Sequence, residues 1–273
     1  MTAEPIVLDS VTHLTKAHHG SVAYCASHGA IYAAYYAASK GVSAVVLNDA
    51  GIGRERAGVS GLDWLDRCGL PGATVSSRSA RIGDGCDGLE SGIISEVNAI
   101  AAEHGITIGM RCRDALARLA ALGLPPAPAV TAENESRFLI PDAGGHGIRV
   151  VAVDSASLIA PDDARNIVVT GSHGGVLGGK PATAAKYDVV AAVYNDAGFG
   201  KDDAGISRLP ALDTRGIAAA CVSCFSARIG DGMSSWIDGY VSAVNATAER
   251  SGARIGQSTR EFAAAIIAAA GRR

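Results

Sequence analysis

The apolar residues of this 273-residue chain fall into short runs rich in Val, Ile and Ala, separated by longer stretches with a helical pattern. Short continuous apolar runs are typical of buried strands. Strands that alternate with helices indicate βα units and a largely parallel sheet. The runs that predict strands are residues 6–8, 22–25, 42–47 and 73–76 in the first part of the chain and 150–153, 167–170, 189–194 and 219–223 in the second.

One helix is predicted from apolar spacing near the end of the chain. Ile237, Tyr240, Val241, Val244 and Ala248 recur at intervals of three and four residues, apart from one adjacent pair. This spacing places them on one face of a helix. We therefore expect an amphipathic helix over residues 237–248.

The pattern of the first part of the chain returns in the second, and the polar motifs repeat most strictly. Asn-Asp-Ala-Gly occupies residues 48–51 and 195–198, and Ser-Ala-Arg-Ile-Gly-Asp-Gly occupies 79–85 and 226–232, each 147 positions apart (195 − 48). Ser-His-Gly at 27–29 returns at 172–174, so the second copy has two extra residues after its histidine. A period this long predicts two fused copies of a compact α/β module, with pseudo-two-fold symmetry, rather than a solenoid.

The copies imply three regions. We expect a first α/β repeat over residues 1–121, a linker rich in Pro and Gly over 122–148 and a second repeat over 149–273. The linker has no counterpart in the other copy. Its residues 137–140 are apolar enough to cover a sheet edge or a pocket instead.

Charge and composition exclude several classes of function. The formal net charge is −3 and no dense Lys/Arg run occurs, so we expect no nucleic-acid partner. No apolar run approaches the ~20 residues of a membrane span, and no basic leader precedes an apolar stretch. We therefore expect a soluble, cytoplasmic protein with a small-molecule substrate and no membrane partner. The alanine-rich residues 263–270 suggest close helix packing, and a homo-oligomer is one interpretation.

Candidate chemistry lies at three glycine-rich turns per copy, each of which follows a predicted strand. Ligands of open α/β sheets bind beyond the carboxyl ends of the strands, so the three turns of a copy can converge on one crevice, with one candidate site per copy. Histidine is suited to proton transfer near neutral pH, which makes His28 and His173 catalytic candidates. Asp49 and Asp196 would orient the histidine or act as a base, although Asx turns or helix caps would explain them without chemistry.

The second copy offers a nucleophile as well. Ser172 precedes His173-Gly174-Gly175, a run that resembles the oxyanion turn of esterases, and Lys180 is a candidate base. The chain has no Gly-x-Ser-x-Gly nucleophile elbow.

The remaining candidates would bind substrate. Arg81 and Arg228 would clamp a carboxylate or phosphate, unless each forms an internal salt bridge with Asp84 or Asp231. The other substrate-binding candidates, all taken from the repeated turns, are Ser27, Gly29, Asn48, Ser79, Gly174, Asn195 and Ser226.

No cofactor is predicted. Residues 174–180 resemble the start of a phosphate-binding loop, but Pro181 replaces the Ser or Thr that would bind magnesium. Histidine with aspartates leaves a divalent metal as an open alternative, although no compact ligand motif is present and no metal site is assigned.

These residues favour an enzyme, a hydrolase that cleaves a C–N bond, amide or cyclic amide, in a small anionic or amide-containing metabolite. His and Asp would supply acid–base chemistry, and the arginines and glycine turns would bind the anion. The alternative is a non-catalytic protein that binds a small carboxylate or phosphate. A third interpretation gives the repeated motifs only structural roles.

Overall fold

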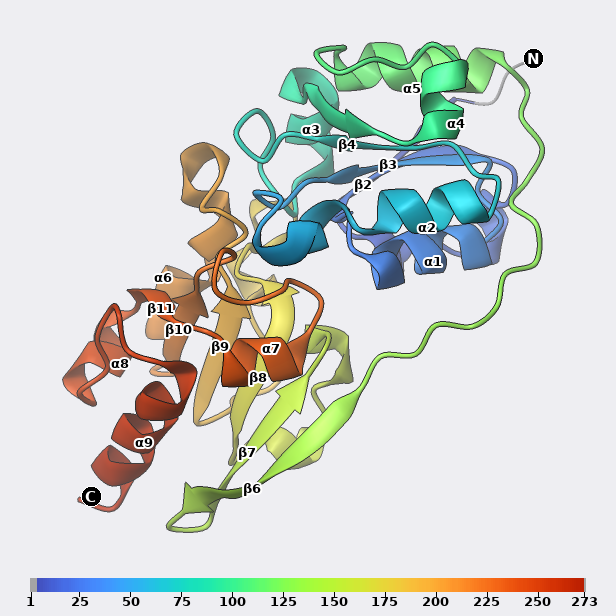
Figure 1. The fold of residues 1–273 in the computed structure, drawn as a ribbon. Helices are drawn as coiled ribbons and strands as arrows, with labels where there is room; N and C mark the ends of the chain where they lie inside the picture. The colour runs from blue at the N-terminus through green and yellow to red at the C-terminus, as the bar shows by residue number, and fades with distance from the viewer. Residues whose placement is uncertain (1–3, 273) are drawn as a thin grey trace.

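The computed structural model describes residues 4–272 as two α/β halves, each with its own mostly parallel sheet. Figure 1 shows the two sheets as separate layers that meet through the loops at one end of each. The strands of the first sheet are β1 Ile6–Leu8, β2 Val22–His28, β3 Ala44–Asn48, β4 Gly72–Val75 and β5 Ile94–Val97. Those of the second are β6 Arg137–Gly145, β7 Ile148–Val153, β8 Ile167–His173, β9 Ala191–Asn195, β10 Ala218–Val222 and β11 Val241–Val244.

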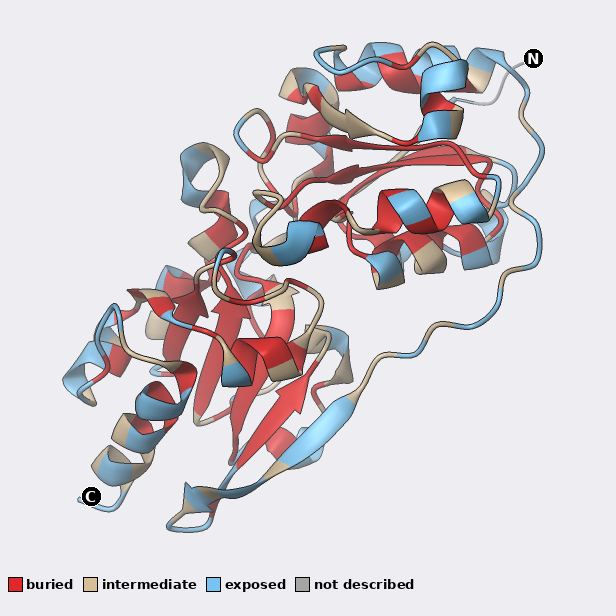
Figure 2. Ribbon diagram, viewed as in Figure 1, coloured by how far each residue is buried: buried red, intermediate tan, exposed pale blue. Residues whose placement is uncertain are grey.

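Helices cover the sheets. They are α1 Ile31–Ser39, α2 Gly61–Arg67, α3 Gly85–Ser91, α4 Ala99–Glu103 and α5 Cys112–Ala121 in the first half, and α6 Arg208–Asp213, α7 Gly232–Ile237, α8 Ala246–Arg250 and α9 Thr259–Ala270 in the second. In the first half α1 and α2 pack on one face of the sheet, and α4 and α5 on the other. Strands covered on both faces must be apolar throughout, and β3 is buried along its whole length (Figure 2).

The second half repeats this order with two differences. The crossover from β8 to β9 contains two short 3-10 turns, Leu177–Gly179 and Pro181–Thr183, where the first half has α1. In addition, β6 pairs antiparallel with β7 at the sheet edge. Residues 137–145 of the predicted linker are therefore a strand that covers an edge, and residues 124–136 contain neither helix nor strand.

The predicted α/β fold with two largely parallel sheets is confirmed, and all eight predicted strands are present. The helix predicted over residues 237–248 is wrong. Here α7 ends at Ile237, β11 follows as an antiparallel edge strand, and Asn245 begins α8 by accepting a hydrogen bond from the amide of Ala248. In β11 Val241 and Ala243 are buried, and the residues that follow each of them are less buried. This alternation is the two-residue period of a strand, not the period of a helix.

The two halves touch at the repeated Asn-Asp-Ala-Gly turns. Gly51 and Gly198 face each other so closely that a Cβ on Gly198 would lie 3.1 Å from the Cα of Gly51. Both turns hold a left-handed backbone, with φ of 48° at Ala50 and 49° at Ala197. Their equivalent contacts give the molecule its pseudo-two-fold arrangement.

Ion pairs across the halves repeat in the same way. Arg81 binds Asp84 in its own half and Asp202 in the other, and Arg228 binds Asp231 and, in the other half, Glu55. A small apolar cluster lies between the halves, composed of Ala50, Ala57, Ile82, Ala197, Ala204 and Ile229. Among residues 4–272, no helix combines the length and apolar character needed to cross a membrane.

We expect Gly198→Ala to destabilise the protein more than Gly216→Ala. Both glycines are left-handed, with φ of 72° and 66°, so both variants carry a backbone penalty of about 1–2 kcal/mol. Only Gly198 meets the other half, whereas a Cβ on Gly216 meets nothing within 4 Å. Overpacking should add about 1–3 kcal/mol to the loss in Gly198→Ala. Urea unfolding measures both variants, and equal losses would contradict the described contact.

Candidate functional site

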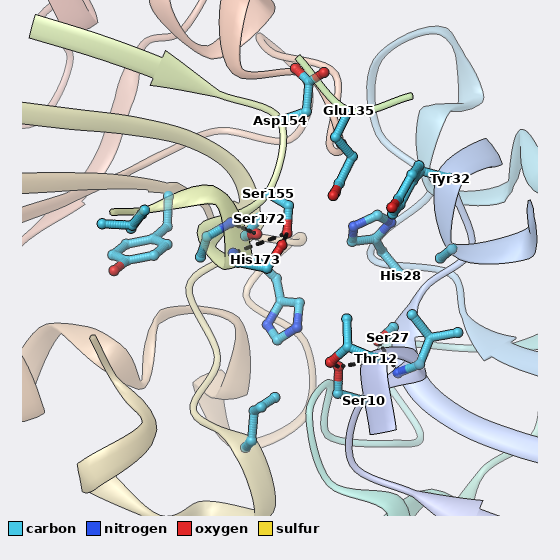
Figure 3. A pocket seen from close by; sticks show the side chains of 18 of the residues that line it. Ser10, Thr12, Ser27, His28, Tyr32, Glu135, Asp154, Ser155, Ser172 and His173 are labelled. Carbon is cyan, nitrogen blue, oxygen red and sulfur yellow. Dashed lines mark hydrogen bonds between the residues drawn. The ribbon is translucent and has the colours of Figure 1, made fainter. Parts of the chain in front are cut away.

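A cavity of about 260 Å³ lies between the two halves, where the carboxyl ends of β2 and β8 meet. Its volume is slightly below the ~300–1,000 Å³ of typical ligand sites, so it suits a small metabolite. Both halves contribute to its wall in matching pairs, namely Ser10 and Ser155, Thr12 and Ser157, Ser27 and Ser172, and His28 and His173. Figure 3 shows the labelled pairs, Ser10 and Ser155, Ser27 and Ser172, and His28 and His173, on opposite sides of the cavity.

Backbone hydrogen bonds fix the paired serines. The Oγ of Ser27 accepts from the amide of Val11 at 2.9 Å, and the Oγ of Ser172 accepts from the amide of Ala156 at the same distance. A hydroxyl that accepts from a backbone N–H keeps its own proton for donation. Each serine therefore offers a hydroxyl donor beside its neighbouring histidine.

The two histidines are neutral hydrogen-bond donors. Burial lowers the pKa of His28 to about 4. Burial, Arg208 and His28 lower the pKa of His173 well below its usual value. The Nδ1 of His28 accepts from the amide of Ala30 at 3.4 Å, and the Nδ1 of His173 accepts from the amide of Gly175 at 3.1 Å. A neutral imidazole has one proton, so this arrangement leaves it on Nε2.

Each imidazole rests against a glycine from the other half. A Cβ on Gly230 would lie 3.5 Å from the Cε1 of His28, and a Cβ on Gly83 would lie 3.5 Å from the Cε1 of His173. Both glycines belong to the Ser-Ala-Arg-Ile-Gly-Asp-Gly motif and have φ near 84° (83° and 84°). The motif thus packs against the histidine of the opposite half, and its arginine does not line the cavity.

Glu135 is a carboxyl of the cavity wall with a raised pKa. It comes from the segment between the halves, and its carboxyl lies near Ser155 and Tyr32 in Figure 3. Burial raises the pKa of this carboxyl to about 7, against the opposing effect of the Ser155 and Tyr32 hydroxyls. Burial and Glu135 raise the pKa of Tyr32 to about 12, so the phenol stays protonated. A carboxyl with a pKa near 7 can both accept and donate a proton at neutral pH.

Two basic side chains complete the wall. Lys186 is exposed and lines the cavity at its surface. Arg208 is buried, donates to the carbonyls of Gly175 and Thr183, and lies 4.9 Å from the ring centroid of Tyr194. Its contacts make it a support for the His173 turn, and Lys186 is the cation nearer to solvent.

The structure brings together only some of the residues predicted from sequence. Ser27, Ser172, His28 and His173 line the cavity, and the other candidates do not. Lys180 is exposed outside it. Gly29 and Gly174 lie behind the histidines, where a Cβ would come within 2.8 Å of neighbouring backbone carbonyls.

The repeated aspartates and asparagines hold turns. Asp49 accepts from the amides of Gly51 and Ser77, and Asp196 accepts from those of Gly198 and Cys224. Asn48 and Asn195 bridge their own turns to the carbonyls of Ala80 and Ala227. These contacts correspond to the Asx-turn alternative that the sequence leaves open.

The repeated serines and arginines likewise have protein partners. Ser79 accepts from the amide of Ile93, and Ser226 from that of Tyr240. Arg81 and Arg228 each bind carboxylates of both halves, as described above. Arg81 also lines a second, more apolar pocket with Pro181 and Ala211. Within residues 4–272, no group of three or more His, Cys, Asp or Glu side chains is arranged to hold a metal ion.

Comparison with models of protein families, with curated proteins and with solved structures gives no match. The function is therefore argued from the site. Sequence reasoning missed Glu135, Tyr32 and Lys186, because none of them repeats: Leu177 stands in the place of Tyr32 in the second half. Ser10 and Ser155 do occupy equivalent positions in the two copies, and this match could have identified them as residues of the site.

We expect His28 to make stability depend on pH. Its pKa is lowered from 6.5 to about 4, so between these values the unfolded chain binds a proton that the native state does not. The free energy of unfolding should therefore fall as the pH drops through this window. Glu135, whose pKa is raised, contributes with the opposite sign. Urea unfolding of Glu135→Gln, with and without His28→Asn, isolates the effect, and identical pH slopes would contradict it.

Proposed function

We propose that this protein is an enzyme that hydrolyses a C–N bond of a small, amide-containing metabolite in the cavity between its halves. The observation that carries the proposal is that the cavity combines a carboxyl with a raised pKa and two histidines with lowered pKa values. Near pH 7 the histidines are neutral donors, and Glu135, whose pKa is raised to about 7, is accessible in both protonation states. Titratable groups whose environments shift their pKa values away from the usual order are typical of acid–base catalysis.

The reaction would use Glu135 twice. Its carboxylate takes a proton from water while the water oxygen attacks the amide carbon. The Nε2–H of a histidine and the hydroxyl of the adjacent serine donate to the carbonyl oxygen as negative charge develops on it. The C–N bond then breaks, and Glu135 gives the proton to the leaving nitrogen. The products are a carboxylic acid and an amine, and no oxidant or reductant is needed.

This proposal assigns the histidines a different role from the one expected from sequence. With Nδ1 bonded to backbone, each imidazole polarises a carbonyl, and the base is a carboxylate from the segment between the halves. The arginine clamp is not part of it, because both arginines have carboxylate partners. An anionic substituent on the substrate would meet Lys186.

Binding without turnover is the second candidate. It is favoured by the many hydroxyl donors of the wall, which would hold a small polar ligand even if Glu135 never moved a proton. A ligand recovered unchanged after prolonged incubation would support this function, and the appearance of an amine product would exclude it.

Glu135→Gln tests the acid–base role. The variant should bind substrate and lose about 10²–10⁴-fold in kcat, because the amide cannot exchange protons. In the wild type, kcat/KM should rise with pH around 7 as the carboxylate forms. Substrates would first be found by thermal shift with small amides, cyclic amides and ureas, followed by amine detection.

Glu133→Gln is the matched control for this substitution. Glu133 lies two residues away and accepts from the indole of Trp64 outside the cavity. Its variant should keep the wild-type pH profile. Equal activity of Glu135→Gln and Glu133→Gln would overturn the proposed mechanism.

Substitution of His173 tests the proposed role of the histidine N–H groups as donors to the carbonyl oxygen. We expect His173→Ala to lower kcat by about 10²–10³-fold, as the removal of an oxyanion donor does. Lys180→Ala should leave kcat unchanged, because Lys180 is exposed and does not line the cavity. Initial-rate kinetics on the same substrate measure both. A large loss in Lys180→Ala would instead restore the lysine as the base.

A further inference from the structure

The donor groups of the cavity repeat with the symmetry of the fold. Each half supplies one Nε2–H from its histidine and one hydroxyl from the adjacent serine. Within residues 4–272, neither Nε2 has a hydrogen-bond partner in the protein. Both imidazoles nevertheless face the same small cavity (Figure 3). A ligand that fills the cavity would therefore cover two equivalent sets of donors.

The chemistry of each set selects an acceptor. A carbonyl oxygen has two lone pairs and can accept one N–H and one O–H together, which matches the histidine and serine of one half. Buried donors left without acceptors are destabilising by about 1–3 kcal/mol each. A ligand with a single carbonyl would satisfy one half and leave the donors of the other unpaired.

Resting on the function proposed above, we propose that the cavity selects a compact ring carrying two carbonyl groups on opposite sides, a cyclic diamide or imide of near-two-fold symmetry. One carbonyl is held by Ser27 and His28 and the other by Ser172 and His173. The ring holds the carbonyls apart at a fixed separation, which reduces the conformational entropy lost on binding. The cavity, with a volume of about 260 Å³, has room for such a ring.

The proposed acid–base group, Glu135, is present once in the cavity and breaks its symmetry. This asymmetry determines which product forms. Glu135 and Tyr32 lie on one side only, because α1 and the segment between the halves have no counterpart in the second half. Water is therefore activated at one carbonyl, and one C–N bond of the ring is broken. The product is an open chain with one new carboxylate. The released nitrogen becomes an amine when the ring is a cyclic diamide and a primary amide when it is an imide, and the second carbonyl remains unhydrolysed.

Matched pairs of ligands test the inference by calorimetric titration of the full chain. The first pair is cyclo-diglycine, a ring with two opposed carbonyls, and piperazinone, the same ring with one. The second pair is succinimide and pyrrolidinone. Where a dione binds, its Kd should be at least about tenfold lower than that of its single-carbonyl analogue. The reason is that its second carbonyl accepts hydrogen bonds from donors that the analogue leaves unpaired.

Three variants locate the recognition. His28→Ala and His173→Ala should each reduce the preference for the dione to about twofold or less, since either one removes a donor from one set. His104→Ala is the control for loss of an imidazole outside the cavity, and it should keep the preference. Circular dichroism and thermal unfolding of each variant confirm that a lost preference does not reflect a lost fold.

The outcomes separate this inference from the proposed hydrolysis. Dione preference with no ring-opened product, neither the amino acid from a cyclic diamide nor the amide acid from an imide, supports the ligand class and contradicts hydrolysis. Hydrolysis of single-carbonyl amides as fast as diones supports hydrolysis and overturns the ligand class. If no dione binds, or if the preference survives in both histidine variants, the ligand class is overturned as well.

Discussion

The contact between the two left-handed turns, Gly51 against Gly198, is the constraint on which the cavity depends. Left-handed backbone is unfavourable for ordinary side chains, and Ala50 and Ala197 both adopt it. Buried aspartates that accept two backbone amides each hold the turns in this conformation. The turns fix how close the halves come, and that distance sets the width of the cavity.

The second repeated motif depends on the same contact. Once the turns meet, the loop that contains Arg81 lies beside the His173 turn of the other half, and the amide of Gly178 donates to the carbonyl of Gly83 at 2.7 Å. The arginines bind carboxylates across the interface, although more than a third of each side chain is exposed. Ion pairs with this degree of exposure contribute about 0–1 kcal/mol each to the free energy of unfolding. Their main effect is therefore to favour one orientation of the two halves.

The repeats made much of the fold predictable from sequence, and the reason is physical. Buried parallel strands must be continuous apolar runs, which is why they were found. The partly buried edge strand β1 was found because its apolar run recurs as β7. The edge strands β5, β6 and β11 were missed because they are short, partly exposed or interrupted, and the run from Ile237 to Ala248 fits the helical period by coincidence. Strict repetition selected His28 and His173 as candidates, and both line the cavity, but it left open whether the two copies share one site.

Repetition could not reveal the rest of the site, because Glu135, the acid–base group that we propose, has no counterpart in the other half. A cavity on a pseudo-two-fold axis has equivalent binding groups on both sides, and identical acid–base groups would compete for the same proton. Because Glu135 has no counterpart in the other half, no second carboxyl competes with it for the proton. Glu135 reaches the cavity only because residues 124–136 cross from one half to the other, and its high pKa arises from burial that the folded arrangement creates. Such a residue carries no periodic signal, so only the three-dimensional structure identifies it.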